Sequence, residues 1–141
     1  MGKLIYLCGA MGCYNNPDDY KRWRREFFEI EFKNVYDGHV AIFDPTEFYS
    51  YENRLHKKES EIMEYELYHV RKSDLIVVNL DRICESVGSI MEIATAKCSG
   101  IPIVAFGSTD GVHPWILECI MRIEDNMDSL IQYVDKYFLN V

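Results

Sequence analysis

One carboxylate in this chain, Glu92, stands where an apolar side chain is expected. The surrounding stretch SVGSIMEIATAKCSG (residues 86–100) predicts a helix packed on a sheet, with a buried stripe of Ile90, Met91, Ile93, Ala94 and Ala96. A carboxylate buried there without a partner loses hydration at a cost of several kcal/mol. A partly desolvated carboxylate is a candidate nucleophile or general base. Two structural alternatives stay open: Glu92 pairs with an arginine, or it forms a capping box with Ser89.

A loop of small residues, SVGS at positions 86–89, comes directly before this helix. The start of a helix exposes unpaired N–H groups and a partial positive charge, which can hold a phosphate or a carboxylate. Ser86 and Ser89 add hydroxyl donors, and Gly88 lets an oxygen approach the backbone closely. The loop therefore predicts an anion-binding turn, and an ordinary serine cap followed by a glycine-containing turn is the alternative.

Short apolar runs separated by helical patterns must position these residues. Four runs rich in β-branched or aromatic residues occupy positions 3–9, 40–45, 74–80 and 101–107, and MRIE at 121–124 is a short fifth. Continuous rather than alternating hydrophobicity is typical of parallel strands that are buried on both faces. The helical patterns run from Asp18 or Asp19 to about Asn34, from Ser60 through Val70, from Val87 to Ser99, from His113-Pro114, and from Asn126 or Asp128 through Tyr137.

This alternation predicts an α/β fold, with one domain over residues 1–141. We expect a doubly wound, mainly parallel five-stranded sheet of the flavodoxin-like order 2-1-3-4-5, with right-handed crossovers. In such sheets the loops at the carboxyl ends of the strands form the pocket. Those loops supply Gly9 and Met11 after the first strand, Asp44 after the second, and Ser86 to Ser89 after the third. These residues are the candidate binding site, and the polar, aromatic segment 47–58 is expected to be a loop or irregular helix.

Composition excludes several function classes. The formal charge is -8, from 23 acidic and 15 basic side chains, and such a surface repels nucleic-acid polymers. The basic run KRWRR at 21–25 is read as a solvated helix face, with contact to a phosphate or a partner as the alternative. Five cysteines without ligand spacing predict neither a zinc site nor a disulfide scaffold. No run approaches the ~20 apolar residues that span a bilayer, so a cytoplasmic protein without membrane contact is expected.

Four motifs in order resemble the nucleoside 2-deoxyribosyltransferase family, which includes the related 2-deoxynucleoside 5-phosphate N-hydrolases. They are YLCGA at 6–10, SDLIVVNLD at 73–81, SVGSIME at 86–92 and SGIP at 99–102. The resemblance implies that Glu92 is the nucleophile that attacks the anomeric carbon of a 2-deoxyribosyl group. It also implies that the hydroxyl of Tyr6 orients this carboxylate, and that Glu66 contacts the base or assists proton transfer. A core tyrosine and a solvent-facing glutamate are the alternatives for Tyr6 and Glu66.

The resemblance implies transfer of the deoxyribosyl group from a deoxynucleoside to another nucleobase through a covalent Glu92–sugar intermediate. Ser86 and Gly88 match residues that serve the phosphate in the N-hydrolases, so hydrolysis of 2-deoxynucleoside 5-monophosphates is an alternative. A non-catalytic nucleotide sensor is a second alternative. The implied chemistry uses carboxylates, so no metal and no cofactor is expected. A homo-oligomer is expected, in which His113 and Trp115 complete the neighbouring pocket or simply begin a helix with a core tryptophan.

Overall fold

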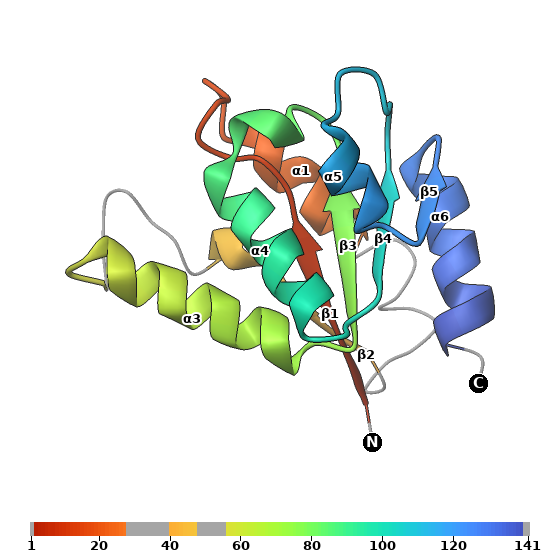
Figure 1. The fold of residues 1–141 in the computed structure, drawn as a ribbon, viewed down its shortest axis with the longest axis horizontal. Helices are drawn as coiled ribbons and strands as arrows, with labels where there is room; N and C mark the ends of the chain where they lie inside the picture. Colours follow the sequence, from red (N-terminus) through yellow and green to blue (C-terminus); the bar gives the residue numbers. More distant parts are fainter. Residues whose placement is uncertain (1, 28–39, 48–55, 140–141) are drawn as a thin grey trace.

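Five strands form the central sheet in the computed structural model, which describes residues 2–27, 40–47 and 56–139 (Figure 1). In order across the sheet they are β2 (Val40–Phe43), β1 (Lys3–Cys8), β3 (Leu75–Asn79), β4 (Ile103–Phe106) and β5 (Arg122–Glu124). Every neighbouring pair is parallel. The predicted doubly wound sheet of order 2-1-3-4-5 is therefore confirmed, and the continuous apolar runs are its buried strands.

Helices cover both faces of the sheet. One face carries α3 (Glu59–Lys72), α4 (Val87–Cys98) and α5 (Pro114–Glu118), and the other carries α1 (Asp18–Glu26) and α6 (Met127–Val134). The helix predicted from Asp18 or Asp19 begins at Asp18, but its expected end near Asn34 lies outside the described residues. Most of the segment predicted as a loop at 47–58 also lies outside them. None of the helices that the structure describes is long and apolar enough to cross a lipid bilayer.

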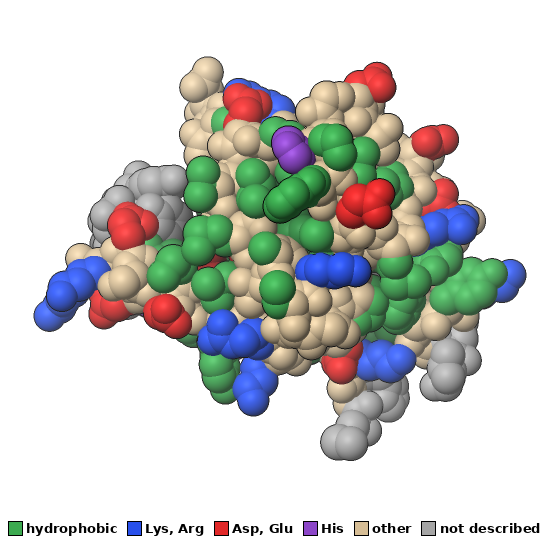
Figure 2. Space-filling view, viewed as in Figure 1, with side chains coloured by type: hydrophobic (Ala, Val, Ile, Leu, Met, Phe, Trp, Pro, Cys, Tyr) green, Lys and Arg blue, Asp and Glu red, His purple; other side chains and the backbone are tan. Residues whose placement is uncertain are grey.

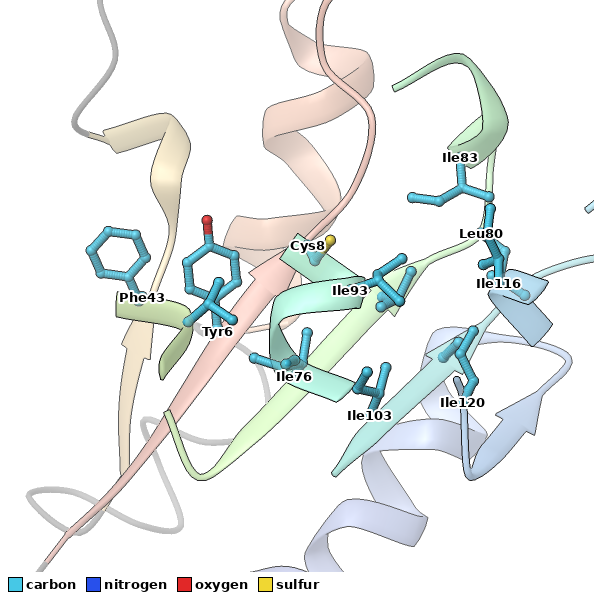
Figure 3. Packing of buried hydrophobic residues seen from close by; sticks show 14 residues of the cluster. Tyr6, Cys8, Phe43, Ile76, Leu80, Ile83, Ile93, Ile103, Ile116 and Ile120 are labelled. Carbon is cyan, nitrogen blue, oxygen red and sulfur yellow. The ribbon is translucent and has the colours of Figure 1, made fainter. Parts of the chain in front are cut away.

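The two-residue repeat of β1 divides the core into two clusters. Tyr6 and Cys8 face α3, α4 and α5, whereas Ile5 and Leu7 face α1 and α6. Figure 3 shows the first cluster, which lies between α4, α5 and the sheet. Because Tyr6 belongs to this cluster, the face of β1 that packs under α4 also carries a candidate catalytic hydroxyl.

The buried stripe of α4 is narrower than its sequence predicts. Ile93 and Ala96 are buried, but Met91 and Ala94 are exposed, so the prediction was wrong for these two residues. An α-helix turns about 100° per residue, so five core positions within a seven-residue stretch cannot all face one sheet. Glu92 shares the buried face with Ile93. The carboxylate is thus placed inside the protein by the helix itself.

Candidate active site

Glu92 is carried into the protein by a helix whose start is closed by serine side chains. Ser86 is the N-cap of α4: its Oγ accepts a hydrogen bond from the Ser89 N–H at 3.3 Å and donates one to Ser89 Oγ at 2.8 Å. Ser89 is therefore the third helical residue, and the capping box between Ser89 and Glu92 does not form. Glu92 lies one turn later, and only 7% of its surface is exposed. The Glu92 carboxylate therefore takes no part in capping the helix.

A cleft between α3 and α4 contains both candidate carboxylates. It consists of two adjoining cavities of about 450 and 310 Å³, and Glu66 and Glu92 line both. The larger cavity has an apolar wall formed by Ile62, Met63, Leu67, Val87 and Met91. Besides the two carboxylates, the smaller cavity is lined by three glycines and two serines, and by Met11, Glu59 and Ile62; the glycines and serines are Gly9, Gly12, Gly88, Ser86 and Ser89. Five of the six predicted binding residues, all but Asp44, thus lie around the smaller cavity.

Tyr6 lies beside the Glu92 carboxylate, whereas its role in orienting that carboxylate stays a prediction. The Tyr6 hydroxyl and Glu92 Oε2 are both buried, and neither makes a hydrogen bond of standard geometry. The hydroxyl is nevertheless close enough to donate towards the carboxylate, which lowers the pKa of Glu92. The ring of Tyr6 is stacked on Phe43, with centroids 5.2 Å apart (Figure 3). This stacking restricts the tyrosine side chain, so Tyr6 is both a core residue and a neighbour of Glu92.

Both carboxylates of the cleft hold their protons more tightly than usual. Burial, together with the neighbouring charge of Glu66, raises the pKa of Glu92 to about 8, although Tyr6 and Arg24 lower it. Burial raises the pKa of Glu66 to about 7, with Arg24 opposing it and Glu59 adding to it. Glu66 therefore ionises first, and its charge disfavours ionisation of Glu92. Near neutral pH the pair holds roughly one proton, which lies mainly on Glu92, and its transfer to Glu66 gives one ionised and one protonated carboxyl group in the reverse arrangement.

Arg24 is a residue of this region that the sequence reasoning missed. The run KRWRR was read as a solvated face, but Arg24 is only 1% exposed, so that interpretation was wrong for this residue. Its Nη2 donates to the Gly9 carbonyl oxygen at 3.0 Å, and its Nη1 donates to the Tyr20 carbonyl oxygen. The guanidinium also lies over the ring of Trp23, 4.7 Å from its centroid. The helical spacing of Tyr20, Trp23, Arg24 and Phe27 places all four on one face, and this signal was present in the sequence.

Asp44, predicted to bind substrate, is held by its own turn. Its Oδ1 accepts hydrogen bonds from the Thr46 N–H at 2.9 Å and the Thr46 hydroxyl at 2.6 Å. The same oxygen lies 3.7 Å from Arg24 Nε. Asp44 therefore contacts Arg24 and does not line either cavity of the cleft. Its direct contact with substrate stays a prediction.

His113 and Trp115 lie at the start of α5, away from the residues that line the cleft. His113 Nδ1 accepts a hydrogen bond from the Trp115 N–H at 3.1 Å, so the histidine caps the helix. Trp115 is 81% exposed, so its alternative interpretation as a core residue was wrong. Within residues 2–27, 40–47 and 56–139, no three His, Cys, Asp or Glu side chains are grouped so that they could hold a metal ion.

The fold is shared with solved structures, although sequence identity to them is low. A conserved protein from Enterococcus faecalis V583 superposes with a TM-score of 0.75 at 18% identity, over 96% of this chain and 99% of that one. A 2-deoxyribosyltransferase from Bacillus psychrosaccharolyticus gives 0.68 at 16% identity, over 92% and 91%. A CMP N-glycosidase from Clostridium botulinum gives 0.60 at 14% identity, over 96% and 100%.

No protein-family model matches the chain, and no curated protein matches its sequence. The resemblance to 2-deoxyribosyltransferases is therefore confirmed at the level of the fold, over most of the chain.

Proposed function

We propose that this protein cleaves the N-glycosidic bond of 2-deoxynucleosides and transfers the deoxyribosyl group to another base. The observation that carries the proposal is the Glu92 carboxylate, which is buried in a cleft opposite Glu66 and has an oxygen without a hydrogen-bond partner. A carboxylate of this kind is costly to fold and is found chiefly where it is used. The shared fold with a 2-deoxyribosyltransferase and a CMP N-glycosidase supports the same reaction class.

The reaction proceeds in two displacements. The reaction uses the less populated protonation state of the pair, in which Glu92 is ionised and Glu66 holds the proton. The Glu92 carboxylate attacks the anomeric carbon, the bond from that carbon to the base nitrogen breaks, and Glu66 donates its proton to the departing base. The sugar is then held as an ester of Glu92. An acceptor base, having lost a proton to Glu66, attacks the same carbon, and the ester oxygen leaves as the carboxylate, so configuration is retained. Tyr6 donates towards Glu92 and holds its orientation, and positive charge on the sugar in each transition state is stabilised by the adjacent carboxylate.

The two cavities suit different parts of a nucleoside. Ile62, Met63, Leu67 and Met91 offer an apolar wall on which a planar base can pack, within about 450 Å³. Gly88 and Ser86 line the more polar cavity, where the hydroxyl groups of a sugar find donors and acceptors. Glu66 and Glu92 border both cavities, so the glycosidic bond would lie at their junction.

The start of α4 favours a second candidate, hydrolysis of 2-deoxynucleoside 5-monophosphates. Ser86 and Gly88 line the smaller cavity at the N-terminus of a 12-residue helix, where backbone N–H groups attract an anion. In that reaction water takes the place of the acceptor base and deoxyribose 5-phosphate is released. The two candidates use the same nucleophile and differ in the group that occupies this end of the cleft.

One set of incubations separates the candidates. Deoxynucleosides with a foreign base, and the matching 5-monophosphates, are each incubated with the protein and followed by chromatography. Exchange of bases supports the transferase, and release of base with deoxyribose phosphate supports the hydrolase. The Glu92→Gln variant should be slower by at least about a thousandfold and should keep substrate binding. Absence of both reactions with every natural deoxynucleoside and its monophosphate would exclude the proposed function.

We further propose that a second copy of this chain covers the open side of the cleft. Hydrophobic side chains gather over α4 and α5 (Figure 2), among them Val87, which is 72% exposed, and Trp115, which is 81% exposed. Val87 also lines the cleft, so a chain packed on this face would exclude water from the reacting groups. Sedimentation should give a dimer or larger assembly, and Trp115→Asp should weaken it. A monomeric wild type at micromolar concentration contradicts this part of the proposal.

A further inference from the structure

Arg24 is the only fully buried cation in the part of the chain that the structure describes. It extends from α1 to the end of β1, where its Nη2 donates to the Gly9 carbonyl oxygen. Gly9 lines the smaller cavity together with Glu66 and Glu92, so Arg24 lies directly behind the wall of the cleft. A buried charge costs several kcal/mol unless it is compensated, so the groups around Arg24 indicate which charges it interacts with.

The contacts of Arg24 compensate its charge only in part, through two carbonyl oxygens, a loose ion pair with Asp44 and the face of the Trp23 ring. Two of them are to carbonyl oxygens, of Gly9 and Tyr20, which carry no full charge. The third group is Asp44, whose Oδ1 lies 3.7 Å from Nε and already accepts two hydrogen bonds from Thr46. Nε itself has no hydrogen-bond partner. A buried cation in a region of low dielectric favours the ionised form of nearby acids and so lowers their pKa values.

The acids that Arg24 affects are Glu66 and Glu92, which line the cleft. The Arg24 guanidinium lowers the pKa of Glu66 and of Glu92, opposing the effect of burial on both. The titratable groups that face this region are Tyr6 and Cys8 from β1, Asp44 from the turn after β2, Glu59 and Glu66 from α3, and Glu92 from α4. All of these are neutral or acidic. Arg24 is thus the cation among them.

Gly9 shows that Arg24 is also a mechanical support. A Cβ atom at this position would lie 3.0 Å from Cζ2 of Trp23 and 3.5 Å from Nη2 of Arg24. The backbone of the first loop therefore rests directly on the Trp23–Arg24 pair, and the hydrogen bond to the Gly9 carbonyl holds it there. Loss of the guanidinium would free this wall of the cleft.

We propose that Arg24 is a positioning residue of the active site: it holds the Gly9 loop in place against the cleft and keeps a buried positive charge behind the wall that Gly9 shares with Glu92. As a catalytic role, this inference rests on the glycosyl transfer proposed above. Arg24 acts through Gly9 and Glu92 and does not line the cleft. Preorganised charge of this kind is effective because it needs no rearrangement during the reaction.

The test measures the ionisation of Glu92 without any turnover. Protein labelled with 13C at the glutamate side-chain carboxyl carbon is titrated by NMR, and the Glu92 resonance is assigned as the one missing from Glu92→Gln. In Arg24→Met we expect the Glu92 midpoint to rise by about one pH unit or more. Arg24→Lys, which keeps the charge without the planar fork, should move it less. The control Arg22→Met removes an exposed cation from the same helix and should leave the midpoint unchanged.

A double variant keeps the test decisive if Arg24→Met does not fold. Arg24→Met with Asp44→Asn removes both members of the buried pair, so no lone charge is left inside. If Arg24 serves only to neutralise Asp44, the Glu92 midpoint in this double variant equals that of the wild type, and the inference is overturned. If Arg24 serves the cleft, the midpoint still rises.

Kinetics then separate this inference from the proposed function. With an active wild type, the acidic limb of the kcat/KM profile should move to higher pH in Arg24→Met by the same amount as the NMR midpoint. A protein inactive on every deoxynucleoside defeats the proposed function, whereas the NMR titration still decides whether Arg24 controls Glu92.

Discussion

Glu66 and Glu92 reach one cleft from two neighbouring helices, and both side chains line each of its cavities. Glu66 comes from α3 and Glu92 from the second turn of α4. Burial raises the pKa of both, and the charge of one opposes ionisation of the other. The pair is therefore a unit that exchanges protons jointly, and substitution of either member should change the behaviour of its neighbour.

Glu66→Gln should lower the maximum rate and move the acidic limb of the kcat/KM profile to lower pH. The rate falls by about a hundredfold because the proton donor is lost. The limb moves because removal of the Glu66 charge lowers the pKa of Glu92. Initial rates from pH 5 to 9 measure both effects. Glu64→Gln removes an exposed carboxyl group from the same helix and should change neither. A fall in rate with an unmoved limb would contradict coupling between the two residues.

Tyr6→Phe should move the acidic limb in the opposite direction. The Tyr6 hydroxyl donates towards Glu92 and lowers its pKa, so its removal leaves Glu92 protonated to higher pH. At pH 7 we expect about a tenfold loss of kcat/KM that is largely recovered at pH 9. The stacking on Phe43 is kept, so thermal stability should change little. Tyr68→Phe, at an exposed position on α3, is the matched control. Equal losses at both pH values would indicate another role for Tyr6.

Glu92→Gln should stabilise the protein at alkaline pH. The pKa of Glu92 is raised by folding from its usual value to about 8, so the stability contributed by the protonated carboxyl is complete below the unfolded pKa, near pH 4.3. This stability is lost as pH rises through 8. Glutamine has no such dependence, so its variant should gain on the order of 5 kcal/mol at pH 9 and little at pH 4.5. Chemical denaturation at the two pH values measures this, and an equal difference at both would contradict the raised pKa.

Two glycines of the cleft should respond oppositely to alanine. At Gly88 a Cβ meets no atom within 4 Å, and alanine favours the helix by about 0.5–1 kcal/mol, so Gly88→Ala should fold and melt slightly higher. Gly88 lines both cavities, so an added methyl group should compete with a ligand for space and raise KM. Gly9→Ala places a Cβ 3.0 Å from Trp23 and should lower the melting temperature. Calorimetry with substrate titration compares them. An unchanged KM in Gly88→Ala would place the ligand elsewhere.

Much of the fold can be predicted from the sequence, because each strand is a short apolar run between helical patterns. The strand order also follows, since parallel strands with right-handed crossovers allow few arrangements. Glu92 could be identified because a carboxylate among Ile90, Ile93 and Ala96 conflicts with the surrounding pattern. This conflict between local pattern and residue type is what made Glu92 a candidate site residue.

Arg24 and Asp44 could not be placed in the same way. Arg24 lies in a run of basic residues whose overall charge suggests solvent, and only its helical phase with Tyr20 and Phe27 reveals burial. Asp44 lies in a loop at the carboxyl end of a strand, where folds of this class bind ligands. Its carboxylate instead accepts a hydrogen bond from the N–H of Thr46, two residues later. Such local competition between a side chain and its own turn depends on backbone angles that residue types do not specify.

The two tryptophans of the chain lie in opposite environments, which makes the protein its own optical reporter. Trp23 is packed against Phe106 and Arg24 behind the Gly9 loop, whereas Trp115 is 81% exposed on the apolar face. Emission from Trp23 should respond when a ligand presses on that loop, and emission from Trp115 should shift to shorter wavelength when a second chain covers it. Trp23→Phe and Trp115→Phe each leave one fluorophore, so ligand binding and self-association can be followed as separate signals in solution.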